Sequence, residues 1–217
     1  MSFLNLFASM TAAHWPAEAL CGLRHKIISY LVLNHYVDLS APQNLVVYLW
    51  RSGTRSVRSQ TALVERIQRS LAPDFELLVE DYSVIAPASH ESGSAWMRSA
   101  YKFFRAAAVI GPHGGSFGNI LFCQRNATII EFNLPWSPAA VDDARENTVR
   151  DLFYSVARGI GISDYWNVWP QEDEKDKGVS AVDFYSKQSM VVDAEEVVEI
   201  LARAGIAQRS STWAWPG

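Results

Sequence analysis

The sequence has few cysteines, little excess charge and no long apolar segment. Its two cysteines, Cys21 and Cys123, are too few for the disulfide framework of a small secreted scaffold. A net charge of −4 gives no electrostatic basis for general nucleic-acid binding. No apolar run reaches the roughly 20 residues that a membrane-spanning helix needs. We therefore expect no disulfide scaffold, no nucleic-acid partner and no membrane span in this chain.

Three further features are absent. The first ten residues, MSFLNLFASM, lack the basic region and the cleavage site of a signal peptide, so we expect the chain to be soluble as given. It could equally be a fragment of a longer, anchored protein. No His, Cys and Asp cluster has metal-ligand spacing, and no Asp-x-Asp triplet occurs, so no metal site is expected. There is also no internal repeat.

What is present predicts a globular α/β fold. Apolar residues make up 49% and charged residues 19% of the chain, which is ordinary for a folded domain. Apolar runs of strand length alternate with helical patterns, which favours a mainly parallel, Rossmann-like sheet with helices on both faces. The expected strands are Leu45–Trp50, Phe75–Glu80, Ala106–Ile110, Ala127–Ile130 and Tyr165–Trp169. The expected helices are Thr61–Leu71, Ser94–Ala106, Ser116–Cys123, Glu146–Arg158 and Asp193–Ala204.

The expected domains follow from this alternation. Residues 45–206 would form the α/β domain, and residues 207–217 a tail. Residues 1–44 read as a helical segment or hinge. The helix over 193–204 would open with a capping box formed by Asp193 and Glu196.

The stretch Ala106–Phe132, AAAVIGPHGGSFGNILFCQRNATIIEF, reads as strand, glycine turn, helix and strand. Glycines at the turn allow backbone N–H groups to approach a ligand closely. A helix that starts there, capped by Ser116, would favour an anion such as phosphate. His113 would lie at the carboxyl end of one strand and Glu131 at the end of the next, where open α/β sheets bind ligands.

A second cluster follows the first predicted strand. Arg51, Arg55 and Arg58 gather positive charge at the carboxyl end of that strand in an acidic protein. Guanidinium groups suit diphosphate oxygens, although a solvated basic loop would have the same composition.

These two motifs resemble glycosyltransferase family 61. GPHGGSFGNILF followed by ATIIEF is similar to the family signature, GxHGAGLTNxLF and then a strand that ends in Glu. In VVYLWRSGTRSVRSQTALVERI, Arg51 and Arg55 match the family's arginine and short basic run. The resemblance covers about Leu45 to Ile206 and omits the family's N-terminal lobe.

The resemblance implies the C-terminal, donor-binding lobe of a GT-B enzyme. The implied function is inverting transfer of a sugar from a UDP-sugar to a hydroxyl of a protein or glycan acceptor, with no cofactor and no metal. The family also implies the secretory pathway, in the Golgi or the endoplasmic reticulum. The implied catalytic residue is His113, and the implied donor-binding residues are Arg51, Arg55, Gly114, Gly115, Ser116, Phe117, Asn119 and Glu131.

Individual roles remain open for some of these residues. Glu131 would hold the ribose, and Asn119 would either buttress the turn or touch the donor. Two rival functions also stay open: a sugar-nucleotide-binding module without catalysis, and a structural α/β protein that binds nothing. Because the acceptor lobe is missing, we expect the chain alone to bind a UDP-sugar but to transfer sugar near the background rate.

Overall fold

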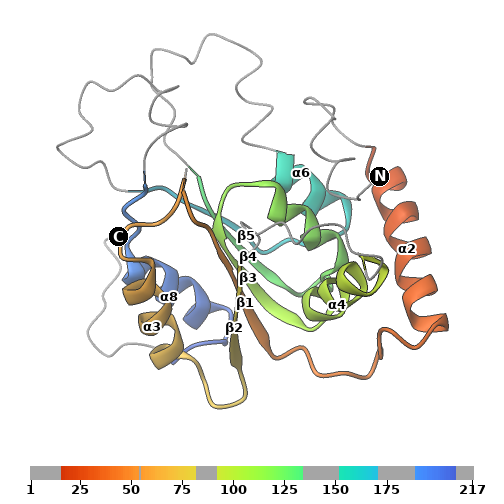
Figure 1. Cartoon of the computed structure of the whole chain (residues 1–217), viewed down its shortest axis with the longest axis horizontal. Coiled ribbons are helices and arrows are strands. Elements are labelled where there is room, and N and C mark those ends of the chain that lie inside the picture. Colours follow the sequence, from red (N-terminus) through yellow and green to blue (C-terminus); the bar gives the residue numbers. More distant parts are fainter. Residues whose placement is uncertain (1–15, 54, 82–91, 134–151, 171–188, 209–217) are drawn as a thin grey trace, which may run out of the picture.

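The computed structural model describes residues 16–53, 55–81, 92–133, 152–170 and 189–208. Within them, five parallel strands form one sheet in the order β2-β1-β3-β4-β5, and helices cover both of its faces (Figure 1). The predicted α/β, Rossmann-like fold class is confirmed. The strands are β1 (Leu45–Trp50), β2 (Glu76–Asp81), β3 (Ala106–Pro112), β4 (Thr128–Phe132) and β5 (Tyr165–Val168).

The central strands are apolar along their whole length because both of their faces are covered. In β1, residues Leu45–Leu49 are all buried, and all seven residues of β3 are buried. Strands buried on both faces read as continuous apolar runs rather than alternating ones. At one edge of the sheet, β2 is only partly buried, with Glu76, Val79 and Asp81 exposed.

Within the described ranges, one face of the sheet carries four helical segments. These are α2 (Ala17–Leu33), α4 (Ser92–Phe104), the 3₁₀ helix η1 (Gly115–Phe122) and α6 (Leu152–Gly159). Leu20 and Leu31 of α2 are fully buried in the same apolar cluster as Val109 and Ile129 of the sheet. The N-terminal helix therefore belongs to the core of the α/β unit. The expected domain limits themselves stay a prediction.

The opposite face is covered by α3 (Gln60–Ser70) and α8 (Ala194–Arg203), which lie side by side (Figure 1). Leu63 and Ile67 of α3 and Val197 and Leu201 of α8 pack against the sheet. Arg66 and Glu195 join the two helices through a bidentate ion pair, with nitrogen–oxygen distances of 2.6 and 2.7 Å.

Two local predictions differ from the structure, and others lie outside the described residues. Ala106 begins β3 rather than ending the preceding helix, since the chain turns at Arg105. In α8 the Asp193 side chain accepts from the N–H of Glu195, so the cap forms without the expected Glu196 partner. Residues 146–151 and 209–217, which include parts of the predicted fourth helix and the tail, lie outside the described residues.

None of the helices in the described ranges is both long enough and apolar enough to span a bilayer.

Candidate functional site

The helices that follow β1 and β3 lie on opposite faces of the sheet. The chain leaves β1 for β2 on one side and later returns to β3 on the other side of β1. After β1 it enters α3, which packs on one face, and after β3 it enters η1, which packs on the opposite face. Connections that diverge in this way leave a crevice at the carboxyl ends of the strands, where α/β folds bind ligands. Arg51 and His113 follow these two strands directly.

The backbone of Arg51 is fixed by a buried glutamine. Gln60, at the start of α3, accepts a hydrogen bond from the Arg51 N–H at 3.3 Å and donates to its carbonyl at 3.2 Å. The Tyr48 hydroxyl donates to the same Gln60 oxygen, also at 3.2 Å. Burial raises the pKa of Tyr48, so its hydroxyl keeps its proton at neutral pH. This network sets the direction in which the Arg51 side chain leaves the strand.

The Arg51 side chain crosses from β1 to the turn after β3. Its Nη1 donates to the carbonyl of His113 at 3.2 Å. A Cβ added to the buried Gly114 would lie 2.2 Å from this Nη1, so the guanidinium occupies the space that any larger residue would need. Glycine is therefore required at position 114 for the guanidinium to rest on the turn. Two residues that the sequence predicted as one site, Arg51 and Gly114, are in contact.

The turn continues into a short helix of the 3₁₀ type, without the expected cap by Ser116. Gly114, and not Ser116, is the residue before the helix, and no side chain caps it. The first intrahelical bond runs from the Phe117 N–H to the Gly114 carbonyl at 2.9 Å. That N–H is thus already used, and the side chain of Phe117 is fully buried, so Phe117 does not match its predicted ligand-binding role. The N–H groups of Gly115 and Ser116 precede this bond and have no intrahelical partner.

Asn119 buttresses the turn. Its side-chain amide donates to the carbonyl of Ser116 at 3.0 Å. Of the two roles left open by the sequence, the structure thus shows the supporting one.

His113 and Glu131 form a buried pair across β3 and β4. Nδ1 of His113 lies 2.6 Å from Oε1 of Glu131, and their side chains are 8% and 0% exposed. The other carboxylate oxygen, Oε2, accepts from the hydroxyl of Tyr165 on β5 and from the amide of Asn133 at 3.1 Å. The His113 ring also packs on Phe153 of α6, with 5.3 Å between ring centroids. The result is a polar network enclosed by apolar side chains.

This network changes the interpretation of Glu131. The sequence predicted a carboxylate that holds a ribose, which requires access for the ribose hydroxyls. Instead Glu131 is fully buried, and three side chains of the protein already bind its two oxygens. Sequence reasoning missed Asn133, Tyr165 and Gln60. No local pattern marks Tyr165 and Gln60, because their partners lie on other strands, and no motif marks Asn133, which follows Glu131 by two residues.

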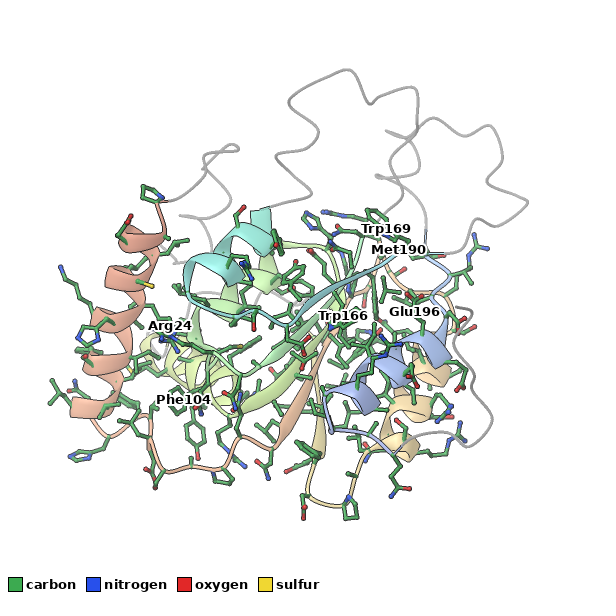
Figure 2. The ribbon with its side chains drawn as sticks, turned by 180° about the vertical axis from the view of Figure 1, so that it is seen from behind. Arg24, Phe104, Trp166, Trp169, Met190 and Glu196 are labelled. Atoms are coloured by element: carbon green, nitrogen blue, oxygen red, sulfur yellow. The ribbon has the colours of Figure 1, made fainter. Side chains whose placement is uncertain are left out.

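The loop after Arg51 is held by a distant segment. Val57 pairs with Met190, and the N–H of Arg58 donates to the Met190 carbonyl at 2.7 Å. Figure 2 shows Met190 above the start of α8. The Arg58 guanidinium donates to Ser189, while Arg55 has a positive φ of 60°. A ligand-binding role for Arg55 stays a prediction. In the described ranges, no three His, Cys, Asp or Glu side chains are grouped so as to hold a metal ion.

Comparisons with known proteins concern mainly the fold. No family model matches the chain, and no curated protein does. A solved structure of an FMN-dependent NADH-azoreductase from Bacillus anthracis in complex with FMN is similar, with 11% identity and a TM-score of 0.46. The match covers 74% of this chain and 98% of that chain.

This match corrects the functional expectation. The similar structure is an FMN-dependent NADH-azoreductase, whereas the resemblance predicted a UDP-sugar glycosyltransferase. It holds FMN, whereas the resemblance predicted no cofactor. Both expectations are contradicted, and we do not retain them. At this identity the likeness describes the fold alone, so the function has to be argued from the residues of the site.

Proposed function

We propose that the chain binds a phosphorylated small molecule at the carboxyl ends of β1 and β3. The observation that carries this proposal is the Arg51 guanidinium, which rests on Gly114 beside the exposed start of η1. Nothing but a glycine fits beneath that guanidinium, so the turn and the arginine form one unit.

The donors of this unit suit a phosphate group. A guanidinium carries five N–H donors and a permanent positive charge. The N–H groups of Gly115 and Ser116, at the open end of η1, add neutral donors next to that charge. Gly115 is exposed, and a Cβ added to it would have no atom within 4 Å, so there is open space beside this residue. Backbone N–H groups and a guanidinium together are a common way to hold phosphate oxygens.

Calorimetric titration tests the proposal directly. The probes are inorganic phosphate, AMP and FMN, which share a phosphate and differ in what it carries. At least one probe is expected to bind, and Arg51→Ala is expected to weaken it about tenfold or more, since a charged hydrogen bond contributes about 1.5–3 kcal/mol.

Arg69→Ala is the matched control. Arg69 is exposed in the last turn of α3, at the opposite end of that helix from Arg51, and its replacement changes the net charge by the same amount. Equal weakening by both variants would show a general charge effect and contradict a local site. Absence of binding by all three probes would contradict the proposed function itself.

A further inference from the structure

The strongest unexplained feature is the buried network around His113. The end of a β-strand does not require a buried histidine that is paired with a buried carboxylate, so this pair calls for another explanation. Its position next to Gly114 places it beside the proposed phosphate site.

The hydrogen bonds assign the protons of this network. The Asn133 amide nitrogen contacts two oxygens, Oε2 of Glu131 and Oδ1 of Asn167, at 3.1 and 2.6 Å, as an NH₂ group does. The Tyr165 hydroxyl supplies a second donor to Oε2. A carboxylate that receives these donors acts as an acceptor, so the contact at Oε1 requires the proton on Nδ1 of His113.

The second ring nitrogen is then a proton acceptor. The hydrogen bond described for the ring lies on Nδ1, which leaves the lone pair of a neutral imidazole on Nε2. The His113 side chain is 8% exposed, and Nε2 lies on the far side of the ring from Nδ1, which faces the buried Glu131.

We propose that His113 is a general base that takes a proton from a hydroxyl, of water or of an alcohol, next to the bound phosphorylated ligand. In this step the O–H bond breaks, the proton moves to Nε2, and the Nδ1–H stays on the ring and keeps its hydrogen bond to Oε1 of Glu131. The positive charge that forms on the ring is balanced by the buried carboxylate 2.6 Å away. Glu131, Tyr165 and Asn133 are positioning residues that fix the ring and its tautomer. The inference rests on the proposed phosphate-binding function for its substrate, but its chemistry can be tested without it.

The first measurement is the tautomer of His113, from long-range ¹H–¹⁵N correlation spectra of the labelled protein at pH 8. The expected spectrum shows the proton on Nδ1. A proton on Nε2, or on both nitrogens at this pH, would overturn the proposal and leave a purely structural pair.

The second measurement is acylation of the histidines by diethyl pyrocarbonate, followed by peptide mass spectrometry. Nε2 attacks a carbonyl carbon of the reagent, and ethyl carbonate leaves and breaks down to ethanol and carbon dioxide. His113 is expected to react despite its burial. Glu131→Gln and Tyr165→Phe are expected to slow it, the former by about tenfold, because the ring loses its orienting acceptor. Tyr165→Phe removes one hydroxyl and keeps the ring, so this variant can test the same contact network if Glu131→Gln does not fold.

Exposed His25 and His35 are internal controls, and Tyr36→Phe is the matched tyrosine control. A probe that binds is expected to protect His113 and leave the two control histidines reactive. Failure of His113 to react in the folded protein overturns the inference whether or not a ligand binds. Binding without protection also overturns it, because Nε2 then does not face the ligand. If His113 reacts but no probe binds, the result supports His113 as a reactive base and contradicts only the proposed phosphate-binding function.

Discussion

His113 and Glu131 are separated by 18 residues in the sequence and by 2.6 Å between Nδ1 and Oε1 in the fold. His113 directly follows β3, and Glu131 is the next-to-last residue of the neighbouring parallel strand β4. From the sequence, both residues were predicted to lie at one site, each with its own role toward a ligand. The structure shows that Glu131 pairs with His113 and is fully buried, whereas the His113 side chain is 8% exposed.

The first prediction concerns the stability of this pair. Tyr165→Phe removes a hydroxyl that donates to Oε2 of the fully buried Glu131. We expect the free energy of unfolding to fall by about 1–3 kcal/mol, because a hydrogen bond to a buried charge is lost. Urea unfolding measures the change. Tyr36→Phe, at a tyrosine that is 44% exposed, is expected to change it by less than about 0.5 kcal/mol. Equal effects of the two variants would contradict the special role of the Tyr165 hydroxyl.

The second prediction concerns Gly114. Gly114→Ala places a methyl group where Nη1 of Arg51 lies, and the flexible arginine can swing away at little cost in stability. We expect the phosphate probe to bind about tenfold more weakly, while the unfolding free energy changes little. Calorimetry and urea unfolding of the same protein separate the two effects. If Gly114→Ala binds the probe with unchanged affinity, the contact between the guanidinium and the turn does not contribute to binding.

The features that the sequence predicts correctly are mostly those that depend on residues close together in the chain. The apolar run Leu45–Trp50 predicted β1 with its observed limits, because a strand covered on both faces must be apolar throughout. The glycine turn and Arg51 were correctly placed together, since parallel strands end at the same edge. The role of Glu131 was not predicted, because it depends on Tyr165, which lies 34 residues further on and reaches it only through the pairing of β4 with β5. The short 3₁₀ form of the helix after Gly114 also has no sequence signal that separates it from an α-helix.

The third prediction contrasts two glycines. A Cβ added to Gly111 would lie 2.8 Å from Cβ and 2.9 Å from the carbonyl oxygen of Leu49, so β1 and β3 would have to move apart. We expect Gly111→Ala to lower the free energy of unfolding by about 1–3 kcal/mol, as overpacking of a core does. Gly22→Ala, in α2 with open space around it, is expected to raise it by about 0.5–1 kcal/mol through helix propensity. Urea unfolding compares them, and a harmless Gly111→Ala would contradict the close approach of the two strands.

The last prediction concerns pH and the ion pair between α3 and α8. Two hydrogen bonds from Arg66 lower the pKa of Glu195 from its usual 4.5. Because the folded pKa is the lower one, the unfolded chain binds more protons, and the stabilisation is fully present above about pH 4.5. It is lost as the pH falls through the folded pKa. Since the pair is partly exposed, at 28% and 41%, its contribution is about 0.2–1 kcal/mol.

Urea unfolding of the wild type and of Glu195→Gln measures this contribution at several pH values. The wild type is expected to be more stable at pH 7, and the difference is expected to shrink as the pH is lowered from 4.5 toward 2.5, because the wild-type carboxylate then becomes neutral like the amide. High salt should reduce the difference at pH 7, since it screens exposed charges. Glu199→Gln is the control: Glu199 pairs with Arg203 within α8 at 3.3 Å, so its loss removes a carboxylate without touching the contact between the helices. A difference between wild type and Glu195→Gln that stays constant from pH 7 to pH 2.5 would show that the two helices are held by packing alone.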